Sequence, residues 1–184
     1  MIHTLAPVEP PFEDNVAQVL QAYPQRGGVL LSLFRVFANS LRFLMKGMPN
    51  LLDAGSPFTL RERELIILRV TARRDCPYEW GVHVAAFARH AGLSEAEVAA
   101  TWTGPSDDPV WADTDRALLR TVDALCDRGG LDDQERAGVQ ALLTVEQQLE
   151  LCALVGAYTT VACVASLARL GPEPFAPAPP TRTA

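Results

Sequence analysis

Apolar residues recur every three to four positions along most of this sequence, and no stretch alternates convincingly as a half-buried strand does. This pattern predicts an all-α fold of about eight helices. Short apolar-rich helices are expected at residues 12–22, 29–38 and 41–52, separated at Gly27-Gly28 and at Asn39-Ser40. Longer helices are expected at residues 59–74, 76–91, 94–103, 113–125, 132–143 and 144–170.

Two consecutive helices between residues 59 and 93 organise the rest of the chain. Thr59, followed three residues later by Glu62, predicts a capping box at the start of the first helix. Asp75 or Cys76 caps the second helix, with Pro77 in its first turn, where a missing N–H costs little. Three further pairs have the spacing of a capping box and predict the starts of later helices: Ser94 with Glu97, Asp132 with Glu135, and Thr144 with Gln147.

The last helix contains an uncharged stretch at residues 151–167. Seventeen residues are few for a membrane span, and polar side chains such as Tyr158 and Thr159 dilute the apolar character of the stretch. We therefore expect a helix buried on most sides rather than a transmembrane segment.

Length and composition favour one domain. The chain has 184 residues, of which 48% are hydrophobic, enough for a core without disulfide bonds. We expect a single helical domain over residues 1–171, followed by a proline-rich, disordered tail over residues 172–184.

The charge balance limits the expected binding partners, and the cysteine pattern indicates the cellular compartment. Sixteen basic and 22 acidic residues give a net charge of −6 without a basic block, so nucleic acid and anionic membranes are not expected partners. The four cysteines show no short paired spacing, and no signal peptide opens the chain. Reduced thiols in the cytoplasm are therefore expected.

The chemistry-bearing residues gather around the junction of the two central helices. Glu79 and His83 are four apart and share a helix face, and Cys76 falls on the same stripe. Glu64 is a charged residue among apolar neighbours, where an unpaired carboxylate is costly. We predict that these four side chains meet in one pocket, although Glu64 in a surface ion pair and His83 bonded to a carbonyl are open alternatives.

Residues 61–68 (RERELIIL) and 76–83 (CPYEWGVH) resemble the carboxymuconolactone decarboxylase family, whose superfamily includes the alkylhydroperoxidase D (AhpD) proteins. The peroxidase branch has a glutamate twelve residues before a C-x-x-C pair, and a histidine four residues after that pair. Here Glu64 precedes Cys76 by twelve and His83 has the expected position, but Glu79 replaces the second cysteine. The decarboxylase branch resembles E-x-x-x-H, which Glu79 and His83 supply.

The resemblance implies an AhpD-like helical fold, assembly as a homotrimer or hexamer, and an enzyme of small-molecule metabolism without a cofactor or metal. The leading hypothesis is acid/base proton transfer, as decarboxylation or isomerisation, on a carboxylated lactone or keto acid. His83 would deliver or remove the proton, and Glu64 and Glu79 would orient the imidazole ring of His83. Arg73 or Arg74 is a candidate for holding a substrate carboxylate.

Several alternatives stay open. Cys76 near a helix start is either a reactive thiol or a small packed residue, and a thiol-dependent peroxidase or antioxidant protein is the second hypothesis. A non-catalytic oligomeric binding protein is the third. Tyr78 and Trp80 are candidate substrate-binding residues, although aromatic packing is their more frequent role. Glu79, His83 and His90 together are a candidate metal site, although spacing alone seldom defines one.

Overall fold

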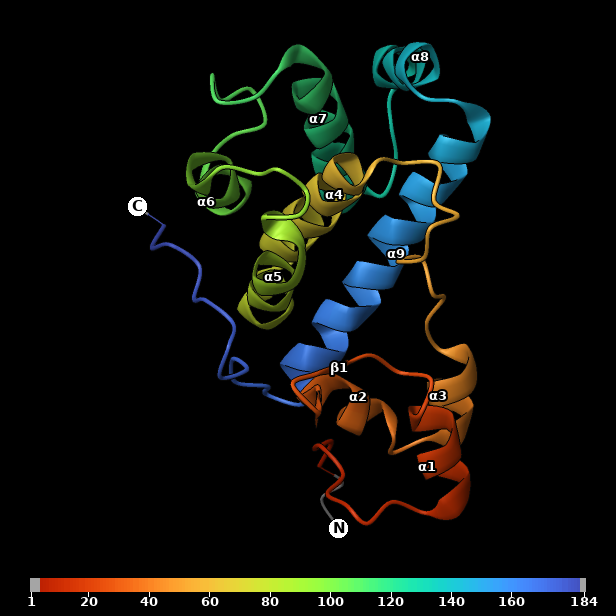
Figure 1. Ribbon diagram of the computed structural model, residues 1–184. Coiled ribbons are helices and arrows are strands. Elements are labelled where there is room, and N and C mark those ends of the chain that lie inside the picture. Colours follow the sequence, from red (N-terminus) through yellow and green to blue (C-terminus); the bar gives the residue numbers. More distant parts are fainter. Residues whose placement is uncertain (1–3, 183–184) are drawn as a thin grey trace.

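The all-α fold is confirmed by a computed structural model of the protein, which describes residues 4–182 (Figure 1). In this part of the chain nine α-helices, one π-helical turn and one hairpin occur, against the predicted count of about eight helices. The elements are α1 (Asp14–Leu20), β1 (Gln25–Arg26), β2 (Val29–Leu30), α2 (Ser32–Phe37), α3 (Leu41–Lys46), α4 (Leu60–Arg73), α5 (Pro77–His83), η1 (Val84–Ala88), α6 (Glu95–Thr103), α7 (Asp113–Arg128), α8 (Asp133–Leu142) and α9 (Val145–Leu167).

Local sequence signals set most helix starts. All four predicted capping boxes are present, at the starts of α4, α6, α8 and α9. In the box of α4, Thr59 Oγ1 accepts a hydrogen bond from the N–H of Glu62, whose carboxylate accepts from the N–H of Thr59. Of the two candidates for the cap of α5, Cys76 holds the position, with Pro77 in the first turn.

In the segment before residue 53 the three expected helices are present as α1, α2 and α3, but they are shorter than predicted. Residues 25–30 form a short antiparallel hairpin in place of the start of a helix. Gly27 and Gly28 both have positive φ, of 57° and 77°, as a tight two-residue hairpin turn requires. The helix expected as far as residue 52 ends at Lys46. Pro49 follows shortly afterwards, and a proline disfavours helical geometry at the residue before it.

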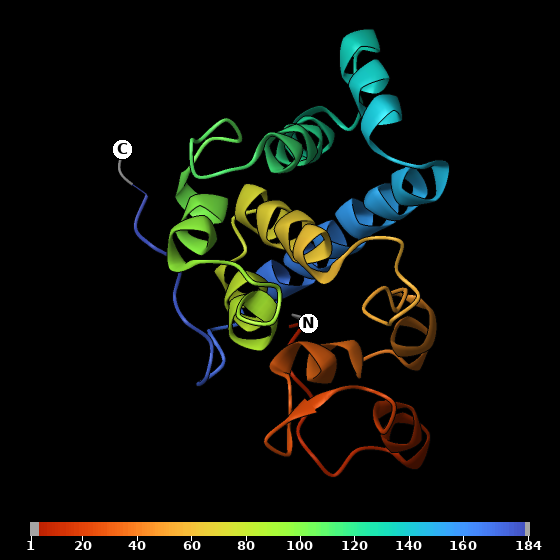
Figure 2. The same cartoon turned by 45° about the horizontal axis from the view of Figure 1, so that its top comes forward.

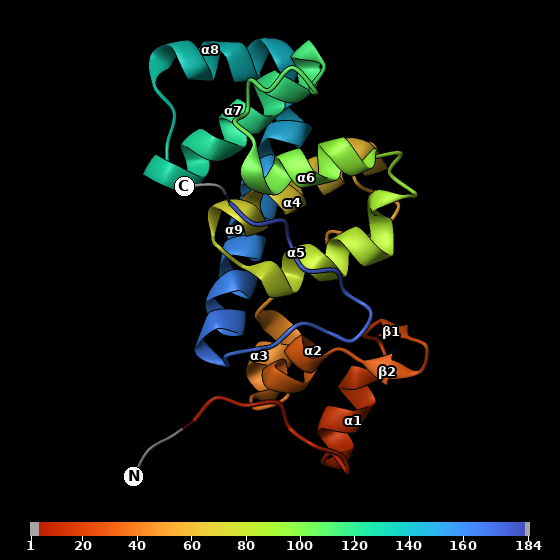
Figure 3. The ribbon, with the colours of Figure 1, turned by 90° about the vertical axis from the view of Figure 1, so that its left-hand side faces the viewer.

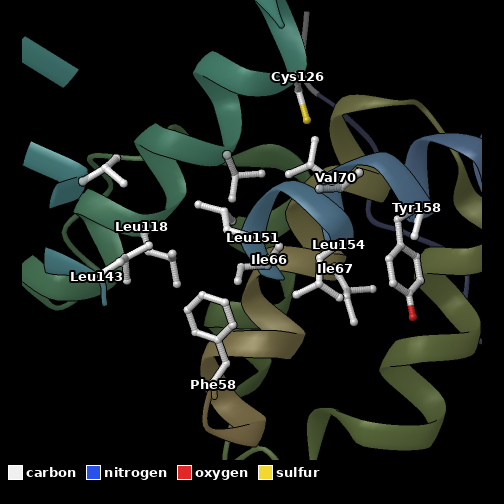
Figure 4. Close-up of a cluster of buried hydrophobic side chains, with 14 residues drawn as sticks. Phe58, Ile66, Ile67, Val70, Leu118, Cys126, Leu143, Leu151, Leu154 and Tyr158 are labelled. Atoms are coloured by element: carbon white, nitrogen blue, oxygen red, sulfur yellow. The ribbon is translucent and has the colours of Figure 1, made fainter. Parts of the chain in front are cut away.

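α4 is the central helix of the molecule. Its residues 63–72 are all buried, so the helix is enclosed on every side. It packs against α5, α6, α7 and α9, which surround it in Figure 2. One apolar cluster lies between α4, α7 and α9, and Ile66, Ile67 and Leu154 are at its centre (Figure 4). Tyr158 lies at the edge of this cluster.

α9 combines a buried side with an exposed apolar side, which differs from the expectation of a helix buried on most sides. Val145, Leu149 and Leu167 are 70% or more exposed, whereas Leu151 and Leu154 are fully buried. Among residues 4–182, α9 alone is long and apolar enough to cross a membrane by length and composition, and 44% of its most apolar window is buried. The core helix of a folded domain satisfies the same criterion.

Residues 172–182 are not a disordered tail, as proline content had suggested, but an ordered strap across α5 (Figure 3). Glu173 is 6% exposed and accepts hydrogen bonds from the Tyr78 hydroxyl and from the N–H of Ser32. The strap passes so close to α5 that a Cβ on Gly81 would meet the Pro177 carbonyl at 2.5 Å. Specific hydrogen bonds, which composition does not reveal, therefore order this segment. The last two residues of the predicted tail lie outside the described part of the chain.

Candidate active site

The structure brings Glu64 of α4 and His83 of α5 into direct contact. The Nδ1 atom of His83 lies 2.7 Å from Glu64 Oε2, and the two residues are 2% and 0% exposed. Arg63, also buried, places its Nε 3.6 Å from the other carboxylate oxygen of Glu64. The surface alternative for Glu64 is therefore excluded, because the carboxylate lies between two buried basic groups.

The second ring nitrogen of His83 faces two further oxygens. Tyr158 Oη, from α9, lies 3.0 Å from His83 Nε2, and Glu79 Oε1 lies 3.4 Å from the same atom. The four-residue spacing places Glu79 one helical turn before His83 on α5. Directly after His83 the helix widens into the π-helical turn η1, a feature that is frequent at functional sites.

The electrostatics of this cluster favour a protonated His83. Burial, the largest single influence, lowers the pKa of the ring, but Glu64 and then Glu79 together outweigh it and raise the pKa to about 9. At neutral pH both ring nitrogens then carry protons, so Nδ1–H donates to Glu64 and Nε2–H points toward Tyr158 and Glu79. Arg63, Glu64, His83 and Glu79 form a chain of alternating positive and negative charges.

Tyr158 stays protonated next to this chain. Burial raises the pKa of its hydroxyl well above the ordinary value of 10, and the carboxylates of Glu79 and Glu64 raise it further. Since Nε2–H of His83 donates to Tyr158 Oη, the hydroxyl proton of Tyr158 is free to donate to another group.

Glu79 and Tyr158 reach the surface of a pocket of about 480 Å³, a size typical of small-molecule sites. Glu79 is only 6% exposed, and its Oε2 has no hydrogen-bond partner within residues 4–182. The remaining wall is mostly apolar and comes from α1, α2, α3, α9 and the loops beside them. It consists of Val19, Ala22, Tyr23, Pro24, Leu33, Phe34, Phe37, Leu44, Met45, Met48, Pro49, Asn50, Leu51, Leu52, Ala157 and Val161.

Cys76 lies near this cluster but is enclosed in apolar packing. The residue is 4% exposed, belongs to the apolar cluster of Val161 and Ala162, and does not line the pocket. Burial raises the pKa of its thiol to about 11, and the charge of Glu79 contributes to the rise. The thiol is therefore protonated at neutral pH, which agrees with the packed alternative and not with a reactive thiolate.

The two aromatic residues proposed for substrate binding lie elsewhere. The Tyr78 hydroxyl donates to Glu173 and accepts from the N–H of Leu33, so it joins α5 to the strap and to α2. Trp80 donates from its indole nitrogen to Thr101 Oγ1 at 2.9 Å, in the apolar cluster between α4, α5 and α6. Neither lines the pocket that contains Glu79, and both have packing roles.

The arginines considered for a substrate carboxylate also lie outside the pocket. Arg73 pairs with Asp127 on α7, and Arg74 donates to Thr159 Oγ1 at 3.1 Å on the exposed surface. His90 is exposed after the π-helical turn and is not part of the His83 cluster. Over residues 4–182, no group of three or more His, Cys, Asp or Glu side chains has an arrangement suited to a metal ion.

Two members of the cluster, Tyr158 and Arg63, were not predicted from the sequence. Tyr158 is 75 residues from its partner His83, and its position in the uncharged part of α9 had suggested only a polar interruption. Arg63 had no role assigned from the sequence. Arg63 is buried beside Glu64 because other helices surround α4 on every side. The pattern of apolar residues within one helix does not show how many neighbours that helix will have.

Comparison with solved structures shows that the fold is AhpD-like. A peroxidase-related protein from Silicibacter sp. TM1040 superposes with a TM-score of 0.76 at 16% identity, covering 95% of this chain and 96% of the other. The debrominase Bmp8, solved as a cysteine-to-alanine variant with 2,3,4-tribromopyrrole, gives a TM-score of 0.76 at 14% identity, with coverages of 95% and 94%. At these low sequence identities, both similarities show the fold alone.

A protein of unknown function from Agrobacterium tumefaciens, described as a putative antioxidant defence protein AhpD, is 26% identical. It covers 64% of this chain and 80% of its own length, with a TM-score of 0.58. Residues 41–119 match the model of the carboxymuconolactone decarboxylase family. No match is found among proteins of curated function. The matched segment contains Glu64, Glu79 and His83 but not Tyr158.

Proposed function

We propose that this protein is an enzyme that transfers a proton at a carbon next to the carbonyl group of a small organic molecule. The observation that carries the proposal is the position of Glu79. One of its carboxylate oxygens lies 3.4 Å from His83, and the other is buried and has no hydrogen-bond partner among residues 4–182. The residue lines an apolar pocket. A carboxylate so placed is within reach of a bound substrate and is held by a fixed imidazolium.

In this reaction Glu79 removes a proton from the carbon, and the electrons of the C–H bond move onto the carbonyl oxygen to give an enolate. The free proton of the Tyr158 hydroxyl is placed to donate a hydrogen bond to that oxygen as its negative charge develops. Return of the proton from Glu79 to a different carbon completes an isomerisation, and return to the same carbon is simple exchange. Atoms and electrons balance without a further reactant.

His83 has a different role in this proposal from the one predicted from the sequence. It does not line the pocket, so it acts on the substrate through Glu79 and Tyr158. Its two N–H groups fix the positions of Glu64 on one side and of the pocket oxygens on the other. His83 and Glu64 are therefore positioning residues, and Glu79 is the catalytic base.

Decarboxylation would use the same groups, with loss of CO₂ in place of proton removal and Glu79 as the proton donor. It requires a substrate carboxylate, and the residues that line the pocket include no lysine or arginine to hold one. Thiol-dependent peroxidation is less well supported, because Cys76 is buried and outside the pocket. Isomerisation or exchange on a neutral carbonyl compound is the form of the reaction that the geometry favours.

The test uses 2-tetralone, a neutral two-ring ketone with acidic protons next to its carbonyl, in D₂O at pH 7. We expect the protein to accelerate exchange of these protons, followed by NMR, and Glu79→Gln to lower that rate by about 10²–10⁴-fold. Glu146→Gln, which changes an exposed carboxylate on α9, is the matched control. Binding of 2-tetralone without accelerated exchange would refute proton transfer. Hydroperoxide reduction that is lost in Cys76→Ser would support the thiol alternative.

A further inference from the structure

We infer that the pocket binds an uncharged, mainly apolar ring compound whose one polar group is a hydroxyl, an N–H or the enol form of a carbonyl, donating to Glu79. This inference rests on the proposed function in treating the pocket as the substrate site. It adds the charge, the shape and the polar group of the molecule that the pocket accepts. Each of these three properties follows from a separate feature of the wall.

The shape follows from the aromatic part of the wall. Tyr23, Phe34 and Phe37 line the pocket together with the ring of Tyr158. Tyr23 and Phe34 meet edge to face with ring centroids 4.8 Å apart, so they form a continuous surface. The hydroxyl of Tyr23 is already used, since it donates to the Leu44 carbonyl at 2.6 Å. Flat, apolar rings pack well against such a surface.

The absence of a counter-ion excludes an anion. Among the residues that line the pocket in the described part of the chain, Glu79 is the one with a formal charge. The positive groups of the cluster lie behind it, His83 next to Glu79 and Arg63 next to Glu64. An anionic ligand would lose its hydration and face a carboxylate first, both of which are unfavourable.

A cation is disfavoured for a different reason. Glu79 already has His83 as its partner, and the alternating charges of Arg63, Glu64, His83 and Glu79 sum to zero. An ammonium group entering the pocket would lose its hydration without meeting an uncompensated negative charge. A neutral ligand avoids both penalties.

The polar group follows from the two residues with polar side-chain groups near His83 that line the pocket, Glu79 and Tyr158. Glu79 Oε2 is buried and has no partner within residues 4–182, and an ionised carboxylate can only accept hydrogen bonds. Tyr158 Oη lies 3.0 Å from His83 Nε2, which leaves the hydroxyl proton to be donated to a ligand. A hydroxyl group on the ligand satisfies both, because it donates to Glu79 and accepts from Tyr158.

Four two-ring probes that differ in one substituent test the inference by isothermal titration calorimetry at pH 7. They are 2-naphthol (a neutral donor), 2-methoxynaphthalene (the same oxygen without the donor), 2-naphthoate (an anion) and 2-naphthylmethylammonium (a cation). We expect 2-naphthol to bind at least about tenfold more tightly than each of the other three. Equal or tighter binding of any of them would overturn the inference, as would the absence of 2-naphthol binding.

The same series on two variants locates the selectivity. Glu79→Gln should reduce the preference for 2-naphthol over 2-methoxynaphthalene and should improve binding of 2-naphthoate, because the charge at the wall is gone. Glu146→Gln, the control, should keep the order found for the native protein. If 2-naphthoate stays excluded from Glu79→Gln, the charge argument is wrong. The native series alone is decisive if that variant fails to fold.

The binding series and the exchange assay test the ligand class and the proton transfer independently of each other. Selective binding of 2-naphthol without catalysed exchange of 2-tetralone would keep the ligand class and refute proton transfer. Catalysed exchange with tighter binding of the anion or the cation would keep proton transfer and refute the ligand class.

Discussion

Replacing Glu64 with glutamine should lower the pKa of His83 from about 9 to below its ordinary value of 6.5. Burial is the largest influence on this ring and lowers its pKa, and the charge of Glu64 is the largest effect that opposes it. Glutamine keeps the shape of the side chain and removes the charge. The effect of burial, which is larger than either single contribution of Glu79, then lowers the pKa.

The same change should remove a pH-dependent part of the stability. The folded-state pKa of His83 lies above the unfolded value, so protonation of the ring favours the folded state. This contribution is fully present below pH 6.5 and is lost as the pH rises through about 9. The difference between the two pKa values corresponds to about 3 kcal/mol of free energy of unfolding. In Glu64→Gln this contribution is absent.

Two measurements check this reasoning. An NMR titration of the histidine ring protons gives the pKa of His83 in both proteins, with the exposed His90 as the reference signal. Urea unfolding between pH 6 and pH 10 gives the free energies, and their difference should shrink by about 3 kcal/mol across that range. Glu146→Gln controls for loss of one negative charge. A His83 pKa that stays near 9 in Glu64→Gln, or a difference that does not vary with pH, would refute the argument.

Three further changes probe the neighbouring groups. Tyr158→Phe removes the donor to the developing enolate and should lower the 2-tetralone exchange rate by about 10²-fold or more, whereas an unchanged rate would remove Tyr158 from the mechanism. Cys76→Ala should leave that rate unchanged, because the thiol is buried and protonated, and a large loss would instead favour thiol chemistry. Glu173→Ala leaves the Tyr78 hydroxyl and the Ser32 N–H without their acceptor and should lower the free energy of unfolding by about 2 kcal/mol in urea. A change of under about 0.5 kcal/mol would show that the strap is only loosely held.

The sequence predicted the parts of the site that depend on neighbouring residues. The capping box of Thr59 orients α4, and Pro77 after Cys76 starts α5. The spacing of Glu79 and His83 then places both on one face, as predicted. These features need only the geometry of one helix and its cap, so short-range patterns are sufficient to find them.

The sequence did not predict the parts that depend on contacts between distant segments. Tyr158 joins the cluster only because α9 packs against α4 and α5. The strap is ordered by the buried carboxylate of Glu173, 95 residues from its partner Tyr78. Whether a proline-rich segment is ordered depends on the hydrogen bonds that its side chains form, and composition does not reveal these.

Glu79 affects the two kinds of chemistry considered for this site in opposite directions. Its charge helps to raise the pKa of His83, which stabilises the imidazolium that holds the pocket oxygens. The same charge adds to the effect of burial in raising the pKa of Cys76 to about 11, which suppresses the thiolate that a peroxidase needs. A pocket arranged around this carboxylate therefore favours proton transfer because of the feature that disfavours thiol chemistry.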